Sequence, residues 1–71
     1  MDYSKLRGRI IEKYNTCERF AEAMGMQPSL LSLKLSATRP WKHNEIILAC
    51  QLLDILGSDV SEYFFAELAY N

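Results

Sequence analysis

The sequence predicts an all-α domain of five helices. Apolar residues recur every three or four positions along most of the chain, which is the period of a helix with one buried face. No stretch alternates apolar and polar residues with the period of a strand, and no Asn-Gly or Asp-Gly pair marks a hairpin turn. A chain of 71 residues has room for one hydrophobic core. We therefore expect a single domain that spans residues 1–71.

The first half of the chain predicts three short helices. The first covers residues 4–14, where apolar side chains recur every four positions. The second covers residues 16–24, and Gly25 ends it because glycine adopts the left-handed conformation without a steric penalty. The third begins at Pro28, since the first turn of a helix tolerates a residue without an N–H group, and Gln27 is its expected cap.

The second half predicts two further helices after a loop at residues 36–40. One begins at His43 or Asn44 and continues until Gly57 interrupts it, and Ser58 caps the last helix. The apolar face of that last helix carries Val60, Tyr63, Phe64 and Leu68. We expect its aromatic side chains to close an otherwise thin core, with self-association as the alternative.

Trp41 directly precedes the fourth predicted helix. We expect it to pack in the core over Ile46 and Ile47, because a large aromatic side chain contributes much apolar surface to a small domain. The alternative is that Trp41 anchors an interface with a partner.

The composition argues against metal-binding, catalytic and membrane functions. Cys17, Cys50 and the single histidine, His43, do not form a zinc-binding pattern. The chain has no nucleophile elbow, no glycine-rich phosphate loop and no cofactor fingerprint. Its longest apolar run has five residues, far short of the roughly 20 that a membrane helix needs. We expect a cytoplasmic non-enzyme with reduced thiols, no metal, no cofactor and no small-molecule substrate.

Charge is unevenly divided along the chain. Residues 1–42 carry eight Lys and Arg against four Asp and Glu, whereas residues 43–71 carry five acids and no Lys or Arg. This segregation favours either an anionic partner for the first half or contact between the two halves, although solvated helix faces produce it too. The cations available for phosphate contacts are Lys5, Arg9, Lys13, Lys34, Arg39 and Lys42.

Residues 16–36 fit a helix-turn-helix motif. Ala21 is small where two helices cross closely, Gly25 makes the turn, and Leu31 fills the angle between the helices. A helical hairpin with no nucleic-acid role has the same spacing, so it remains the alternative.

Five segments carry a resemblance to a known group: DYSKLRGRIIEKYNT, RFAEAMGM, LSLKLS, EIILACQLLDI and EYFF. They resemble the small Cro- and repressor-like helix-turn-helix proteins of temperate phages of Gram-positive bacteria, and within that group the modulator-of-repression (Mor) antirepressors. The resemblance implies a five-helix lambda-repressor-like domain that works in the switch between lysis and lysogeny. It also implies a partner, the N-terminal DNA-binding domain of a CI-type repressor.

The outward face of the third helix lacks strong base-reading side chains. Serine is an ambiguous reader of bases, and leucine or proline offers only apolar contact to a thymine methyl. The resemblance aligns Cys17 with a glutamine that grips a phosphate in lambda-type motifs, and a thiol is a weak donor. An exposed Leu33 suits an apolar protein surface, although single exposed leucines are common.

We therefore predict an antirepressor that binds the repressor domain through its third helix, with DNA bound weakly or only jointly with the repressor. The predicted contact residues are Gln27, Pro28, Ser29, Ser32 and Leu33, with Lys34 and Arg39 as charges at the rim. The alternative is a Cro-like repressor whose dimer places two third helices in successive major grooves. Its phosphate contacts would include Lys5, Arg9, Lys13 and Lys42.

Overall fold

Residues 3–68, the part of the chain that the structure describes, fold into five α-helices and one short 3-10 helix, η1. The bounds are Ser4–Tyr14 for α1, Cys17–Met24 for α2, Pro28–Leu35 for α3, His43–Leu53 for α4, Gly57–Asp59 for η1 and Val60–Leu68 for α5. The computed structural model describes residues 3–68, except for the side chains of residues 65–68. No strand occurs within that range. The prediction of an all-α fold with five helices is confirmed.

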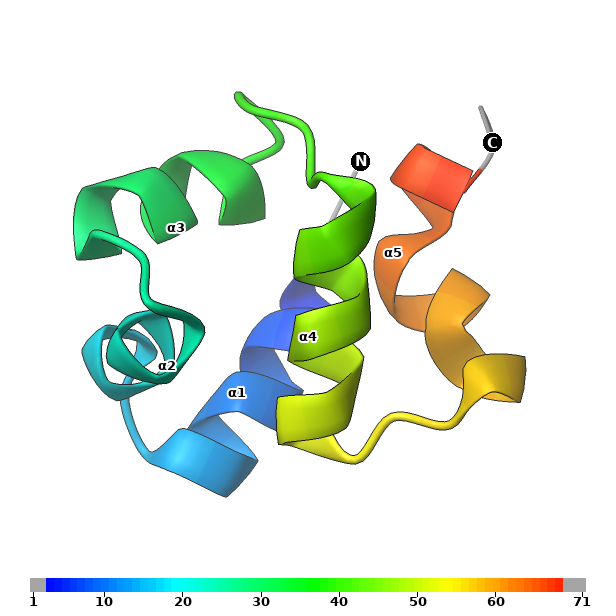
Figure 1. The fold of residues 1–71 in the computed structure, drawn as a ribbon, viewed down its shortest axis with the longest axis horizontal. Helices are drawn as coiled ribbons and strands as arrows, with labels where there is room; N and C mark the ends of the chain where they lie inside the picture. Colours follow the sequence, from blue (N-terminus) through cyan, green and yellow to red (C-terminus); the bar gives the residue numbers. More distant parts are fainter. Residues whose placement is uncertain (1–2, 69–71) are drawn as a thin grey trace.

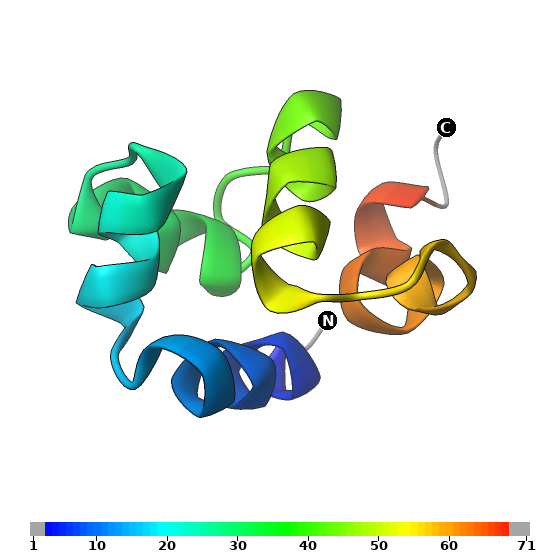
Figure 2. The same ribbon diagram turned by 60° about the horizontal axis from the view of Figure 1, so that its bottom comes forward.

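Helix α4 lies between the α2 and α3 pair on one side and α5 on the other (Figure 1). Helix α1 contacts α2, α4 and α5, and it runs along one end of the molecule from the side of α5 to the side of α2 (Figure 2). Helix α3 is the most peripheral element, because its main helical neighbour is α2. The arrangement leaves one long side of α3 open.

An aromatic cluster of Tyr3, Trp41 and Phe64 closes the core on the side of α5. The rings of Trp41 and Phe64 meet edge to face, with centroids 5.1 Å apart, and the Tyr3 ring lies 6.4 Å from each of them. All three side chains are almost fully buried. The cluster therefore joins the beginning of the chain, the loop before α4 and α5.

The core position predicted for Trp41 is correct, but one predicted neighbour is not. Ile46 is buried, whereas Ile47 turns outward and keeps 48% of its surface exposed. The pattern had placed both isoleucines in the core, yet adjacent residues of a helix point about 100° apart, so one face accommodates only one of them.

The helix ends agree with the sequence in the first half of the chain. Thr16 Oγ1 accepts a hydrogen bond from the Arg19 N–H at 3.1 Å, and Gly25 ends α2 with a left-handed φ of 70°. Pro28 occupies the first turn of α3. Gln27 stands at the cap position, but its side chain makes no capping hydrogen bond, so that part of the prediction is wrong.

The helix ends in the second half required correction. Helix α4 stops at Leu53 and does not continue to Gly57, because Asp54 adopts the left-handed conformation with φ of 54°. Aspartate tolerates that conformation better than most residues do. Ser58 lies inside η1 and caps no helix, while the predicted apolar position Leu68 has its side chain outside the described residues.

We predict that Phe64→Ala lowers the free energy of unfolding by about 3–5 kcal/mol, because it removes a fully buried ring from the aromatic cluster. Urea denaturation followed by circular dichroism measures the loss. Leu56→Ala is the matched control, since Leu56 is 67% exposed, and it is expected to change stability by less than about 0.5 kcal/mol. Equal effects of the two substitutions would contradict the prediction.

Candidate functional site

Helices α2 and α3, with the turn at residues 25–27, form the α2–α3 unit. The N–H groups of Gly25 and Met26 donate to carbonyls of the last turn of α2, at 3.0 Å to Glu22 and 2.9 Å to Ala21. These bonds satisfy carbonyls that a helix end leaves unpaired. Ala21 and Leu31 are fully buried, so the two helices pack closely where the sequence predicted a small residue and an apolar one.

One side of α3 faces solvent, and we call it the α3 face. It comprises Pro28, Ser29, Ser32, Leu33 and Ser36, all of them exposed. Gln27 is exposed directly before it. The predicted contact residues from Gln27 to Leu33 therefore share one surface. Leu33 keeps 36% of its surface exposed and is the large apolar side chain of this face, while Leu31 and Leu35 point into the core.

Lys34 does not belong to the rim of this surface, which corrects the prediction. It is only 3% exposed. Its Nζ lies 2.8 Å from Glu45 Oε1 and donates to the Pro40 carbonyl at 2.9 Å. The sequence contained the information, because Lys34 stands three residues after Leu31 and one before Leu35, on the buried side of α3.

Glu45 connects this buried lysine to the first turn of α4. Its Oε1 also accepts a hydrogen bond from the Lys42 N–H at 2.8 Å, which caps the helix. Burial raises the pKa of Glu45, but the hydrogen bonds from Lys34 and Lys42 and the charges of both lysines outweigh it, so the pKa is lowered overall. Glu45 is therefore ionised at neutral pH in the folded protein.

The predicted cations of α1 lie against the second half of the chain. Arg9 Nε donates to the Leu53 carbonyl at 2.8 Å, and Lys13 Nζ pairs with Asp54 at 2.9 Å. These cations neutralise the negative C-terminal end of α4. Lys5 pairs with Glu62, and these contacts lower the pKa of Glu62 and of Asp54. Of the three explanations for the segregated charge, the structure favours contact between the two halves.

Most of the cations predicted for phosphate contacts are not exposed near the α3 face. Arg39 and Lys42 are exposed in the chain that follows α3. Arg7 is exposed on α1 and lines a hollow that also borders Pro28 and Ser32 of the α3 face. The sequence alone does not indicate a role for Arg7, because its position beside α3 depends on how α1 packs against α2.

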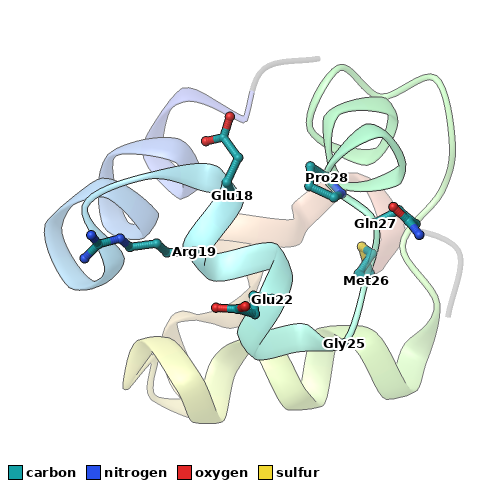
Figure 3. A pocket seen from close by; sticks show the side chains of 7 residues that line it. All are labelled: Glu18, Arg19, Glu22, Gly25, Met26, Gln27 and Pro28. Atoms are coloured by element: carbon teal, nitrogen blue, oxygen red, sulfur yellow. The ribbon is translucent and has the colours of Figure 1, made fainter.

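Two carboxylates on α2 were also absent from the predicted contact residues. Glu18 and Glu22 are exposed one turn apart, and they line a hollow between α2 and the turn that leads to Pro28 (Figure 3). Their spacing of four residues puts them on one side of α2. Nothing in the sequence alone indicated that this side adjoins the beginning of α3.

The described residues contain no group of three or more His, Cys, Asp or Glu side chains placed to hold a metal ion. Cys17 and Cys50 are both free thiols, and burial raises the pKa of Cys50. None of the helices formed by residues 3–68 is long and apolar enough to cross a membrane.

Comparison with known proteins places the chain in a family. Residues 1–67 match the family model described as "Protein of unknown function (DUF739)". The chain belongs to the DUF739 family. The search of curated proteins found no match.

Among solved structures, this DUF739 member is similar to the solution structure of the modulator of repression (MOR) of the temperate bacteriophage TP901-1 from Lactococcus lactis. The two share 42% sequence identity with a TM-score of 0.82, and the match covers 93% of this chain and 89% of the other. The resemblance to small phage proteins of the modulator-of-repression type is therefore confirmed.

We predict that the free energy of unfolding falls in acid and that Glu45 accounts for part of the fall. The pKa of Glu45 is lowered on folding, so its contribution is complete above the unfolded value of about 4.3 and disappears as the pH decreases through the lower folded value. Urea denaturation between about pH 3 and pH 7 measures the dependence. Asp54 and Glu62 act in the same direction from exposed positions.

The variant Glu45→Gln is expected to be less stable at neutral pH and to lose less stability in acid than the wild type. Glu12→Gln is the control, because the Glu12 carboxylate is exposed and pairs only with Arg9 of its own helix among the described side chains. An acid dependence of Glu45→Gln as steep as that of the wild type would refute the assignment.

Proposed function

We propose that this protein is a phage regulator that acts by binding a CI-type repressor, as a modulator of repression. The observation that carries the proposal is the likeness, at 42% identity over 93% of the chain, to a protein that is itself a modulator of repression. We interpret the α2–α3 unit as a helix-turn-helix motif within residues 16–36 of a single domain. In this proposal the protein works in the bacterial cytoplasm without a cofactor.

The chemistry of the α3 face supports a protein partner. Direct base readout relies on arginine, lysine, asparagine or glutamine side chains that reach base edges. The α3 face presents serines, a proline and Leu33, and the amide of Gln27 stands before its first turn. An apolar side chain surrounded by hydroxyl groups is typical of a small protein interface with a polar rim. We therefore propose that Leu33 contacts the N-terminal DNA-binding domain of the repressor.

The distribution of cations also disfavours tight binding to DNA by this protein alone. Lys5, Arg9 and Lys13 contact acidic groups or carbonyls of α4 and α5, and Lys34 is buried. Each ion pair would have to open before its cation could neutralise a phosphate. With a net charge of −1, the chain also attracts a polyanion only weakly over long distances.

The second candidate function is that of a Cro-like DNA-binding repressor. It is favoured by one observation, the exposed cations Arg7, Arg39 and Lys42 around an open α3. In such a protein these residues hold backbone phosphates while α3 enters the major groove.

We predict that Leu33→Asp abolishes binding to the repressor domain while the fold stays intact. The substitution puts an unpaired charge in the centre of the proposed contact and costs at least about 2–4 kcal/mol of binding free energy. Isothermal titration calorimetry against the N-terminal domain of the CI-type repressor of the same phage measures it. Leu56→Asp is the control, since Leu56 is exposed and precedes η1, away from the α3 face. Unchanged affinity of Leu33→Asp would place the interface elsewhere.

A mobility-shift assay on the switch region of the same phage separates the two functions. The protein alone is expected to bind this DNA weakly and with no preference for one operator, because the α3 face lacks base-reading groups. Tight retardation of a single operator sequence at moderate salt would establish the Cro-like function instead.

A further inference from the structure

We propose that Glu18 selects the partner by pairing with a cationic side chain on the DNA-facing surface of the repressor domain. The inference rests on the proposed function and names a specificity-determining residue for it. It follows from the position of Glu18 between two hollows, from its surroundings, and from the chemistry of any surface that binds DNA.

Glu18 stands where two hollows meet beside the α3 face. One hollow lies between α2 and the turn, and it borders Glu18, Glu22 and Pro28 (Figure 3). The other lies where α1, α2 and α3 come together, and it borders Arg7, Glu18 and Ser32. Glu18 and Pro28 line both hollows. A protein surface that covers the α3 face from its first turn therefore also covers the Glu18 side chain.

The Glu18 carboxylate is available for a partner. It is exposed, and among the described side chains it forms no ion pair. Its neighbour Arg19 extends away from Pro28 and so leaves that side of Glu18 open (Figure 3). Arg7 borders the second hollow but forms no ion pair with Glu18, so the charge of this carboxylate is not neutralised within the described part of the chain.

The place of Glu18 in the α2–α3 unit determines which charge it attracts. It lies in the first turn of α2, where helix-turn-helix proteins direct backbone N–H groups at a DNA phosphate. A carboxylate at this position repels a phosphate. A repressor domain, by contrast, presents lysine and arginine side chains on its DNA-facing surface, because it neutralises phosphates with them. Glu18 thus favours that surface and disfavours DNA itself.

The test compares Glu18→Gln with the wild type by calorimetry against the purified DNA-binding domain of the CI-type repressor, at low and at high salt. Glu18→Gln removes the charge and keeps the size of the side chain. It is expected to weaken binding about tenfold at low salt and to make the affinity less dependent on salt. Glu18→Asp keeps the charge and is expected to recover most of the affinity. Glu12→Gln, the matched control on the exposed side of α1, is expected to change the affinity less than twofold.

The outcomes distinguish this inference from the proposed function. A Glu18→Gln affinity within twofold of the wild type overturns the role of Glu18 and leaves the proposed function standing. A loss that is independent of salt and is not recovered by Glu18→Asp also overturns it, because a purely structural role in the first turn of α2 has that signature. An absence of binding by the wild type overturns the proposed function, and the inference falls with it.

Discussion

The position of α3 depends on the buried ion pair between Lys34 and Glu45. Their side chains are only 4% and 16% exposed, and the lysine Nζ also donates to the Pro40 carbonyl. Buried charges are costly unless they are paired and hydrogen-bonded. A movement of α3 away from α4 would separate these two charges at low dielectric. Because α3 is peripheral and packs chiefly on α2, this interaction and the burial of Leu35 together fix its second end and hold the α3 face in place.

Ion pairs and hydrogen bonds between helices also determine which charged side chains remain available to a partner. Arg9 and Lys13 hold the C-terminal end of α4, Lys5 holds α5, and Lys34 holds α3. Four of the eight Lys and Arg side chains are thus employed between helices, while Arg7, Arg19, Arg39 and Lys42 remain exposed. The outward surface of the α2–α3 unit carries hydroxyl groups, one leucine, the amide of Gln27, the carboxylates of Glu18 and Glu22, and the guanidinium of Arg19. In the proposed function, this surface of hydroxyl groups, one leucine and carboxylates suits a basic protein surface better than it suits DNA.

Local chemistry explains which parts of the fold were predictable from sequence. Gly25 and Pro28 act within one turn of the backbone, so their positions placed the end of α2 and the beginning of α3 correctly. The end of α4 was misplaced, because Asp54 adopts a left-handed conformation with Lys13 bound to its carboxylate and Arg9 to nearby carbonyls. Both of those cations come from α1, about forty residues earlier in the chain, and no local pattern contains them.

The candidate site likewise contains residues that the sequence predicted correctly and residues that it did not. The exposure of Ser29, Ser32 and Leu33 follows from the helical period once Leu31 is known to be buried. The spacing of Lys34 from Leu31 and Leu35 indicated the buried side of α3, but Lys34 was misplaced because its partner Glu45, which makes the buried charge tolerable, belongs to another helix. Glu18 was missed for a related reason. Its relation to the α3 face arises where three helices meet, so a residue that looks like an ordinary solvated glutamate in the sequence borders both hollows beside α3 in the structure.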